Sequence, residues 1–354
     1  MAESDYSDLH AVQERLLAWF AVQGRDLPWR HTRDPYAILV AEIMLQQTGV
    51  ERVLPKYEAW LTRFPTLHAL AAAARSEVIR LWSGLGYNSR AVRLHDVARQ
   101  VVDRHGGHLP ETMEGLLTLK GIGRYTAGAV ACFAHEQDVA FVDTNIRRVL
   151  GRVFLGPAGD SPTLPEKRLR ELAEQVLPRG RAWAWHQALM DLGATVCTDA
   201  TPACLVCPLQ GRCRAAFQAG RLAREARAAY RTRPKEGPWR GSSRYYRGRI
   251  VAALAALPRG EHLTLSALAA RVTPDMEDGA ITRLQDLVTK LAAEGLVAEY
   301  ETADGQLEVA LPESTAQQDA LVAEDTQGQG DADEAEEHHG GDRERHVQRH
   351  RGAD

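Results

Sequence analysis

The chain has 354 residues, of which 44% are hydrophobic and 25% charged, so it is long enough for two or three domains with substantial cores. No apolar run approaches the roughly 20 residues that a membrane helix needs, and the acidic N-terminus lacks the basic and then apolar pattern of a signal peptide. These features exclude a membrane-spanning protein and predict a cytoplasmic one.

The net charge of −4 is unevenly distributed. Residues 1–249 hold 35 Lys/Arg and 25 Asp/Glu, whereas residues 250–354 hold 8 and 22. A basic body with an acidic end predicts an anionic partner for the body, although basic faces are often only solvated.

Residues up to about 215 show helical periodicity with no alternating strand pattern, which predicts an all-α domain over residues 1–219. A helix should begin at Asp34-Pro35, because Asp is a good N-cap and Pro suits the first helical position. Further helices are predicted over 51–63, 75–83, 90–105, 111–118, 125–134, 144–154, 165–176 and 181–193.

A basic linker is predicted over residues 220–243. Helices over 244–258, 264–272 and 279–294, followed by two short strand-like runs, outline a winged-helix-like C-terminal domain over 244–312. Residues 313–354 hold almost no large apolar side chains, so we expect a disordered tail rich in acidic residues and histidine.

One carboxylate stands out in the stretch ILVAEIMLQQT, residues 38–48, where Glu42 lies among large aliphatic residues. An unpaired buried carboxylate is costly, because desolvation disfavours its charged form. A chemical role would explain its presence. The alternative is an amphipathic helix that lifts Glu42 to the surface.

Four of the five cysteines fall within seventeen residues, in the pattern C-x6-C-x2-C-x5-C. In a cytoplasmic protein such spacing indicates a metal site rather than disulfides. Four thiolates can hold Zn²⁺ or a [4Fe–4S] cube, and the single C-x-x-C pair favours the cube. The candidate ligands are Cys197, Cys204, Cys207 and Cys213, whereas Cys132 has the apolar setting of a core residue.

A Gly-x-Gly turn between two predicted helices lies in LLTLKGIGRYTAGAV, residues 116–130. Glycine lets the backbone approach a partner closely, and the N–H groups that begin the next helix favour an anion. No strand precedes the turn, so a dinucleotide-binding fold is excluded. The turn is either a hairpin that grips a DNA phosphate, formed by Lys120, Gly121, Ile122 and Gly123, or an ordinary tight turn.

A second carboxylate, Asp143, follows the apolar run VAFV at the start of a predicted helix. As a helix N-cap it would be unremarkable. It lies about twenty residues after the hairpin, however, so it can face the same groove as Glu42.

Seven stretches occur together in order: LPWR (27–30), AEIMLQQT (41–48), LWSGLGYNSRA (81–91), LKGIGRYTAG (119–128), FVDTNIRRVL (141–150), HQALMDLGATVC (186–197) and the four-cysteine loop. Over about residues 8–217 they resemble the helix–hairpin–helix DNA glycosylase superfamily and, within it, the A/G-specific adenine glycosylases. The resemblance implies a [4Fe–4S] cluster, base-excision repair of adenine opposite 8-oxoguanine or guanine, and a monomer associated with the bacterial nucleoid.

The resemblance also implies roles for three catalytic residues. Glu42 would protonate N7 of the flipped adenine, because an apolar setting keeps a carboxyl protonated near neutral pH. Asp143, at a polar helix start, would stay ionised and stabilise the oxocarbenium-like sugar, with Tyr125 near a covalent intermediate. Endonuclease III, a bifunctional relative, has a nucleophilic lysine where this chain has Tyr125 and lacks the glutamate.

By the same resemblance, other residues match positions that contact DNA. Gln187 would read the edge of adenine, Gln47 and Tyr87 would enter the base stack, and Thr48 would contact the opposing base. The remaining adenine-pocket positions are Trp29, Arg30, Leu45, Val50 and Met190.

The chain departs from the family pattern at three places. Gly49 replaces a larger polar residue, and Asn88 replaces an aromatic one. Residues 244–312 do not resemble the β-rich, Nudix-like domain that reads 8-oxoguanine in many members, so they are the part that could take its place. Two alternatives remain open: a bifunctional glycosylase/lyase, and a non-catalytic DNA-binding protein that carries a cluster.

Overall fold

The computed structural model describes residues 3–157, 164–218, 242–272, 280–302 and 304–313, and it is mostly helical. The helices of the first part are α1 Glu3–Gln23, α2 Pro35–Leu45, α3 Val50–Arg63, α4 Leu67–Ala71, α5 Arg75–Trp82, α6 Ser89–His105, α7 Met113–Leu117, α8 Arg124–His135, α9 Thr144–Leu150, α10 Glu166–Gln175 and α11 Ala182–Thr195. Short 3-10 turns η1 Pro28–Arg30, η4 Cys204–Val206 and η5 Gln210–Arg212 connect them, and η2 Gly151–Leu155 is a π-helical turn. The predicted all-α fold of this part is confirmed.

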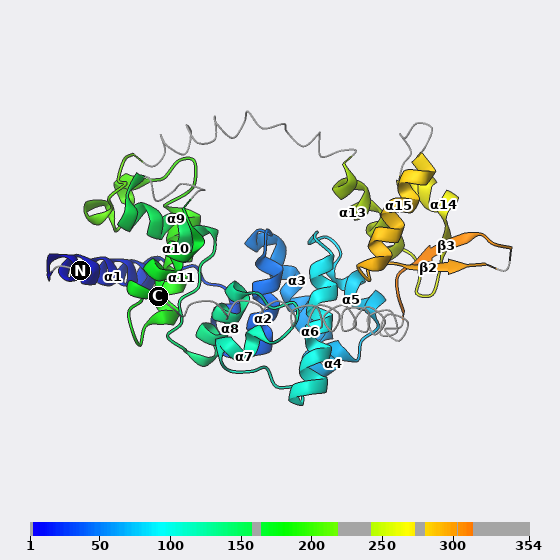
Figure 1. Ribbon diagram of the computed structural model, residues 1–354, viewed down its shortest axis with the longest axis horizontal. Coiled ribbons are helices and arrows are strands. Elements are labelled where there is room, and N and C mark those ends of the chain that lie inside the picture. Colours follow the sequence, from blue (N-terminus) through cyan, green and yellow to red (C-terminus); the bar gives the residue numbers. More distant parts are fainter. Residues whose placement is uncertain (1–2, 158–163, 219–241, 273–279, 303, 314–354) are drawn as a thin grey trace, which may run out of the picture.

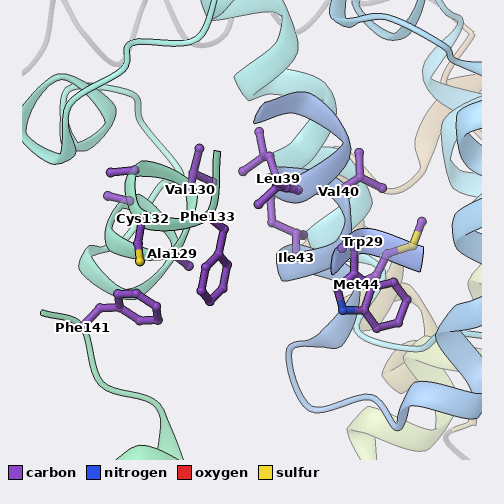
Figure 2. Close-up of a cluster of buried hydrophobic side chains, with 14 of the residues drawn as sticks. Trp29, Leu39, Val40, Ile43, Met44, Ala129, Val130, Cys132, Phe133 and Phe141 are labelled. Atoms are coloured by element: carbon purple, nitrogen blue, oxygen red, sulfur yellow. The ribbon is translucent and has the colours of Figure 1, made fainter. Parts of the chain in front are cut away.

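The predicted start of α2 is confirmed in detail. Asp34 is the N-cap and its side chain accepts a hydrogen bond from the backbone N–H of Tyr36, while Pro35 occupies the first helical position. Every residue from Tyr36 to Met44 is buried, so α2 runs through the centre of the helical part. Figure 2 shows Leu39 and Ile43 of α2 facing Val130 and Phe133 of α8, with Phe141 beside them.

The helices form two groups (Figure 1): α1 and α9–α11 lie together on one side, and α2–α8 on the other. Helix α2 packs against both α3 and α8, and α11 packs against α9 and α1. No helix of the described residues is both long and apolar enough to cross a membrane.

A smaller module, residues 242–313, has its own hydrophobic core. It contains α13 Ser243–Ala255, α14 Leu265–Val272 and α15 Ala280–Ala293, with strands β1 Leu263–Thr264, β2 Ala298–Glu301 and β3 Leu307–Ala310. The antiparallel sheet has the order β1-β3-β2, and Ala298 pairs with Ala310. Three helices and a β-hairpin agree with the predicted outline. We call this unit the C-terminal module; it lies beside α5 in Figure 1.

Three predicted helices differ from those observed, and of these the one predicted over 244–258 ends three residues early, at Ala255 of α13. The helix predicted over 144–154 ends as α-helix at Leu150 and continues as the π-helical turn η2, because the carbonyls of Arg152 and Val153 accept hydrogen bonds from Ala215 and Arg214. The helix predicted over 111–118 is shorter, since the Thr112 side chain caps α7 at Met113. The predicted linker over 220–243 lies almost entirely, and the tail after Glu313 entirely, outside the described residues.

Candidate active site

A large groove lies where η1, α2, α8, α9 and α11 meet, and it joins segments that are far apart in the sequence. Most of the predicted site residues line it: Trp29, Arg30, Glu42, Leu45, Gln47, Thr48, Val50, Gly121, Gly123, Tyr125, Asp143, Gln187 and Met190. The predicted residues Tyr87, Lys120 and Ile122 are not among the lining residues. Arginines at several points of the lining, including Arg93, Arg124 and Arg147, give the groove a positive wall.

Glu42 lies on the third turn of α2 and is only 4% exposed. Burial raises its pKa from 4.5 to about 7, the hydrogen bond from Tyr125 opposes the rise, and the negative charge of Asp143 adds to it. The Tyr125 hydroxyl, on the first turn of α8, donates to Glu42 Oε2 over 2.6 Å. Glu42 therefore does not reach the surface: it is a buried carboxyl that exchanges a proton near neutral pH.

Asp143 is the N-cap of α9. Its Oδ1 accepts from the backbone N–H of Ile146 over 2.6 Å, and its Oδ2 accepts from Asn145 Nδ2 over 3.1 Å. Burial raises the pKa of Asp143 above 3.8, and these hydrogen bonds counter the rise because they favour the carboxylate. Asp143 is thus more buried than the sequence predicts for a polar helix start. Both of its carboxylate oxygens nevertheless accept hydrogen bonds.

The backbone around Asp143 depends on one glycine. A Cβ atom added to Gly193 of α11 would lie 2.6 Å from Asn145 Cβ, closer than packed atoms approach. The absence of a side chain at Gly193 therefore lets α9 approach α11 and keeps Asn145 in reach of Asp143.

Tyr125 joins the two carboxylates into one site. Burial raises its pKa well above 10, and the charges of Glu42 and Asp143 raise it further, so the phenol keeps its proton. Its hydroxyl also lies 3.9 Å from Met190 Sδ on α11. The three side chains therefore come from α2, α8 and the start of α9, and they bring two carboxyl groups and a phenol to one groove.

The pocket residues that the sequence predicts have mixed environments. Trp29 is buried and packs edge-on against Tyr57, with ring centroids 5.4 Å apart. Arg30 lines the groove, but its guanidinium makes two hydrogen bonds of 2.7 and 2.9 Å to the fully buried Asp191. Arg30 therefore fixes η1 against α11. Leu45 and Val50 pack against the main core at its groove edge, and Gln187 lies 3% exposed on α11.

The two residues predicted to enter the base stack share an unusual backbone. Gln47 has φ of 54° and Tyr87 has φ of 47°, a left-handed conformation that is strained for residues other than glycine. Tyr87 is 46% exposed, so its ring is available to a partner.

The hairpin between α7 and α8 has the geometry that the Gly-x-Gly pattern predicts. Gly121 has φ of 103°, and Gly123 is the N-cap of α8 without a side-chain hydrogen bond. Ile122 is buried in the core, and the backbone N–H and C=O of Lys120 are both bonded to the Gln100 side chain. The turn thus anchors one residue inward and presents the start of α8 at the groove.

The four clustered cysteines line one cavity formed by the segment after α11 and the turns η4 and η5. Burial raises the pKa of Cys207 to about 11, and the thiols of the other three cysteines raise it further. Among the described residues, no three His, Cys, Asp or Glu side chains come close enough to hold a single metal ion. Four thiols that line one cavity are a donor set that either a zinc ion or an iron–sulfur cluster can use. Arg152 Nη1 lies 3.5 Å from Cys197 Sγ.

The sequence did not single out two buried charges that organise the groove. Arg90 makes hydrogen bonds to both turns that carry Gln47 and Tyr87, and Asp191 binds Arg25 and Arg30. Both lie within the quoted motifs. For Asp191 the available signal was a charged residue in a largely apolar helical stretch, the same signal that marked Glu42; Arg90 lies among polar residues, so no such signal marked it.

Comparison with known proteins identifies the family. Residues 40–175 match the HhH-GPD superfamily of base excision DNA repair proteins. An adenine DNA glycosylase of Mycolicibacterium smegmatis is 44% identical over 243 residues, which cover 68% of this chain and 78% of that protein. The adenine DNA glycosylase of Mus musculus is 46% identical over 221 residues, 60% of this chain, but the match spans only 43% of the mouse protein.

Among solved structures, a thermostable thymine-DNA glycosylase has a TM-score of 0.56 and 32% identity, covering 60% of this chain and 97% of that one. The helical part thus has a glycosylase fold, and the mycobacterial relative covers the largest share of this chain among the three. The chain belongs to the HhH-GPD superfamily of base excision DNA repair proteins and, within it, to the adenine DNA glycosylase family.

Proposed function

We propose that the protein is a monofunctional DNA glycosylase that removes adenine paired with 8-oxoguanine or guanine in duplex DNA. One observation carries this proposal: Glu42 and Asp143 line the same groove as Tyr125. Glu42 is a buried carboxyl whose pKa is raised to about 7 and which accepts a hydrogen bond from Tyr125, whereas Asp143 accepts one from the backbone of α9. One acid and one anion with separated pKa values are what cleavage of a glycosidic bond needs.

The reaction follows from these three residues. Protonated Glu42 gives its proton to N7 of the flipped adenine, so that the base leaves as a neutral molecule when the bond from N9 to C1′ breaks. Ionised Asp143 stabilises the positive charge that develops on the sugar. Water then adds to C1′, and the Tyr125 hydroxyl holds Glu42 at the position where the proton is delivered and later recovered.

The lyase alternative requires an amine that attacks C1′ and forms a Schiff base. No described residue that lines the groove is lysine, and the phenol of Tyr125 occupies the α8 position that faces Glu42. These side chains support hydrolysis of the glycosidic bond alone. The DNA strand would then stay intact until alkali cleaves it at the abasic site.

For the cofactor we propose a [4Fe–4S] cluster held by Cys197, Cys204, Cys207 and Cys213. The shared cavity and the C-x6-C-x2-C-x5-C spacing support it. The cluster would hold the loop after α11 together. Its role would be structural, because no residue of that loop lines the catalytic groove. The cysteine loop contacts η2 through Arg152, so the cluster would also support the segment that follows α9.

The partner that we propose is duplex DNA with an adenine mispair, and the site of action is the nucleoid of a cell. The arginine-lined groove and the hairpin at the start of α8 support binding of phosphates. Base removal requires flipping, and Gln47 and Tyr87 are the side chains that would replace the extruded base in the stack.

Removal of thymine is the second candidate, because a solved thymine-DNA glycosylase is 32% identical over nearly all of its length. The site argues for a purine: N7 of adenine accepts a proton from Glu42, and thymine has no ring nitrogen with a free lone pair. The two candidates are distinguished by the released base.

The test is an excision assay on matched duplexes that contain A:8-oxoG, A:G, A:C, T:G, T:A or thymine glycol, treated with and without alkali. We expect release from A:8-oxoG and A:G and strand cleavage only after alkali. Release of thymine from T:G without release of adenine would contradict the proposal, and so would cleavage of the strand without alkali.

A further inference from the structure

Arg90, the second residue of α6, is buried at the end of α2 and is only 4% exposed. Its Nη1 donates to the carbonyls of Ile43 and Met44, each over 3.0 Å, and also to that of Gln46. The last carbonyls of a helix lack partners within the helix and carry the negative end of its dipole. A buried guanidinium therefore caps the C-terminus of the helix that bears the catalytic glutamate.

The same guanidinium holds a second turn, the one before α6. Its Nη2 donates to the carbonyl of Gly86 over 2.9 Å and to that of Leu85 over 3.4 Å. It also donates to Thr48 Oγ1 over 3.0 Å, and it lies 5.6 Å from the centroid of the Tyr87 ring. One side chain thus bonds residues 46–48 and residues 85–87, which we call the wedge turns.

Each wedge turn contains one strained residue. Gln47 and Tyr87 are two of only four non-glycine residues with positive φ in the described parts of the chain. Such a conformation persists only where the surroundings fix it, and the bonds from Arg90 lie on both sides of Gln47 and directly before Tyr87. Burial lowers the pKa of Arg90 to about 10, which still leaves the side chain charged at neutral pH.

We propose that Arg90 is a positioning residue that joins the two wedge turns into one rigid unit, so that Gln47 and Tyr87 enter the base stack together. The unit is attached to α2, and Arg90 therefore also sets the distance between the two wedge turns and Glu42. The inference rests on the proposed function, because it assigns these turns to base flipping. A lysine in its place has a compact ammonium without a planar fork, and it cannot reach both turns at once.

The test uses Arg90→Lys in the full chain, with Arg104→Lys as the matched control, because Arg104 is an exposed arginine of the same helix. Flipping is followed by the fluorescence of 2-aminopurine placed at the target position, in a Glu42→Gln background so that the base is not removed. Single-turnover adenine release is measured separately in proteins that retain Glu42. Circular dichroism and Tm report whether the variants fold.

We expect Arg90→Lys to reduce the 2-aminopurine signal and to slow adenine release by about 10- to 100-fold, as loss of a well-held geometry does. An adenine that faces an abasic site has no pairing partner and costs less to flip, so this duplex should restore part of the rate. Equal slowing on both duplexes would overturn the inference, as would full flipping by Arg90→Lys. If Arg90→Lys does not fold, Thr48→Val removes one acceptor of the guanidinium, and an unchanged 2-aminopurine signal in this variant would overturn the inference.

The outcomes remain separate from those of the proposed function. A wild-type protein that flips the base but releases no adenine would contradict the proposed function and leave this inference standing. An Arg90→Lys variant that releases adenine at the wild-type rate would contradict this inference and leave the proposed function standing.

A second inference has an independent basis, the contact between the C-terminal module and α5. Ile79 and Val92 of the helical part are buried in the hydrophobic core of the module. Arg80 Nη1 donates to the carbonyl of Ala255 over 2.6 Å and also to that of Leu257, and the backbone N–H of Ser76 donates to the carbonyl of Pro312 over 2.8 Å. The end of α13 and the end of the module are thus both fixed to α5.

This attachment brings one basic side chain close to Tyr87, in the second wedge turn. Arg244, on the first turn of α13, is exposed, and its guanidinium lies 5.8 Å from the centroid of the Tyr87 ring. The other two arginines of α13 are bonded within the module: Arg247 to Glu294, and Arg249 to the Tyr245 hydroxyl and the Arg271 carbonyl. Arg244 is therefore the arginine of this helix that faces the DNA side of the helical part.

We infer that the C-terminal module is part of the DNA-binding surface and that Arg244 binds a DNA phosphate beside Tyr87. A guanidinium suits a phosphate because its N–H groups can bond two oxygens at once. The inference also depends on the proposed binding of duplex DNA. The rest of the module is acidic, so the contact is confined to the start of α13.

The test compares Arg244→Ala with Arg259→Ala, since Arg259 is an exposed arginine of the same module that pairs with Glu313. Affinity for A:8-oxoG duplex and for undamaged duplex is measured against salt in the Glu42→Gln background. We expect Arg244→Ala to weaken both complexes and to reduce the log–log salt slope by about 0.9, and Arg259→Ala to change neither. Unchanged slopes would overturn the inference, and a loss confined to the 8-oxoG duplex would show base reading instead of phosphate binding.

Discussion

Replacing Glu42 by glutamine keeps the shape of a buried side chain and removes its proton. The amide oxygen of the Glu42→Gln variant could still accept a hydrogen bond from the Tyr125 hydroxyl, now 2.6 Å from Glu42 Oε2. The amide could not protonate a leaving base. We therefore expect Glu42→Gln to lower the rate of adenine release by about 10²- to 10⁴-fold, the usual effect of losing a general acid, while binding to mispaired DNA is retained.

The same substitution should stabilise the protein in alkaline solution. Burial raises the pKa of Glu42 from 4.5 to about 7, so between these values the folded chain binds a proton that the unfolded chain has lost. Stability therefore falls as pH rises through this range. At 1.36 kcal/mol per pKa unit, the ionised Glu42 costs roughly 3 kcal/mol above pH 7, and Glu42→Gln removes this cost.

Thermal unfolding followed by circular dichroism measures the effect. For a helical part of this size, roughly 3 kcal/mol corresponds to a Tm difference of about 6 to 12 °C at pH 8.5, and the difference should vanish near pH 4.5. Asp103→Asn, an exposed carboxylate on α6, is the control that should show no such dependence on pH. A constant Tm difference between pH 4.5 and 8.5 would refute the raised pKa, and a wild-type rate of adenine release would remove Glu42 from the mechanism.

Three further predictions concern the same site and its partners. The single-turnover rate should depend on pH as a bell: it falls as pH rises through about 7, where Glu42 loses its proton, and it falls in acid where Asp143, whose pKa burial raises above 3.8, gains one. A flat profile from pH 5 to 9 would contradict these assignments. The purified protein should be brown and hold about four irons per chain, and one zinc without iron would contradict the cluster. Binding to duplex DNA should weaken with salt, by about 0.9 in log–log slope for each phosphate bound, and a slope near zero would place the DNA away from the arginine-lined groove.

Local signals in the sequence predicted most of the helices. Asp34 and Pro35 mark the start of α2, and the apolar run before Asp143 marks the start of α9, because capping and proline act within a few residues. Glu42 was recognised for the same reason: its neighbours in the sequence are also its neighbours on a buried helix. The raised pKa is a direct consequence of that burial.

Contacts between distant segments could not be predicted from the sequence. The acceptors of Arg90 in one turn lie 42 to 47 residues before it and those in the other turn three to five residues before it, and Asp191 lies 161 residues from Arg30. No local period indicates such pairs. The change from α9 to the π-helical turn η2 has the same origin, since residues 214 and 215 take up its carbonyls. The attachment of the C-terminal module through Ile79 was likewise invisible, because an apolar residue on α5 could equally have faced the core of the helical part.

Identifying what leaves the DNA tests the proposed adenine glycosylase activity most directly. An A:8-oxoG duplex labelled in both the adenine base and the strand is incubated with the protein, and the released base is identified by chromatography while the strand is examined with borohydride and then with alkali. We expect free adenine, no protein trapped on the DNA by borohydride, and an abasic strand that breaks only in alkali. Recovery of a borohydride-trapped complex, or of an intact strand with adenine still attached, would contradict it.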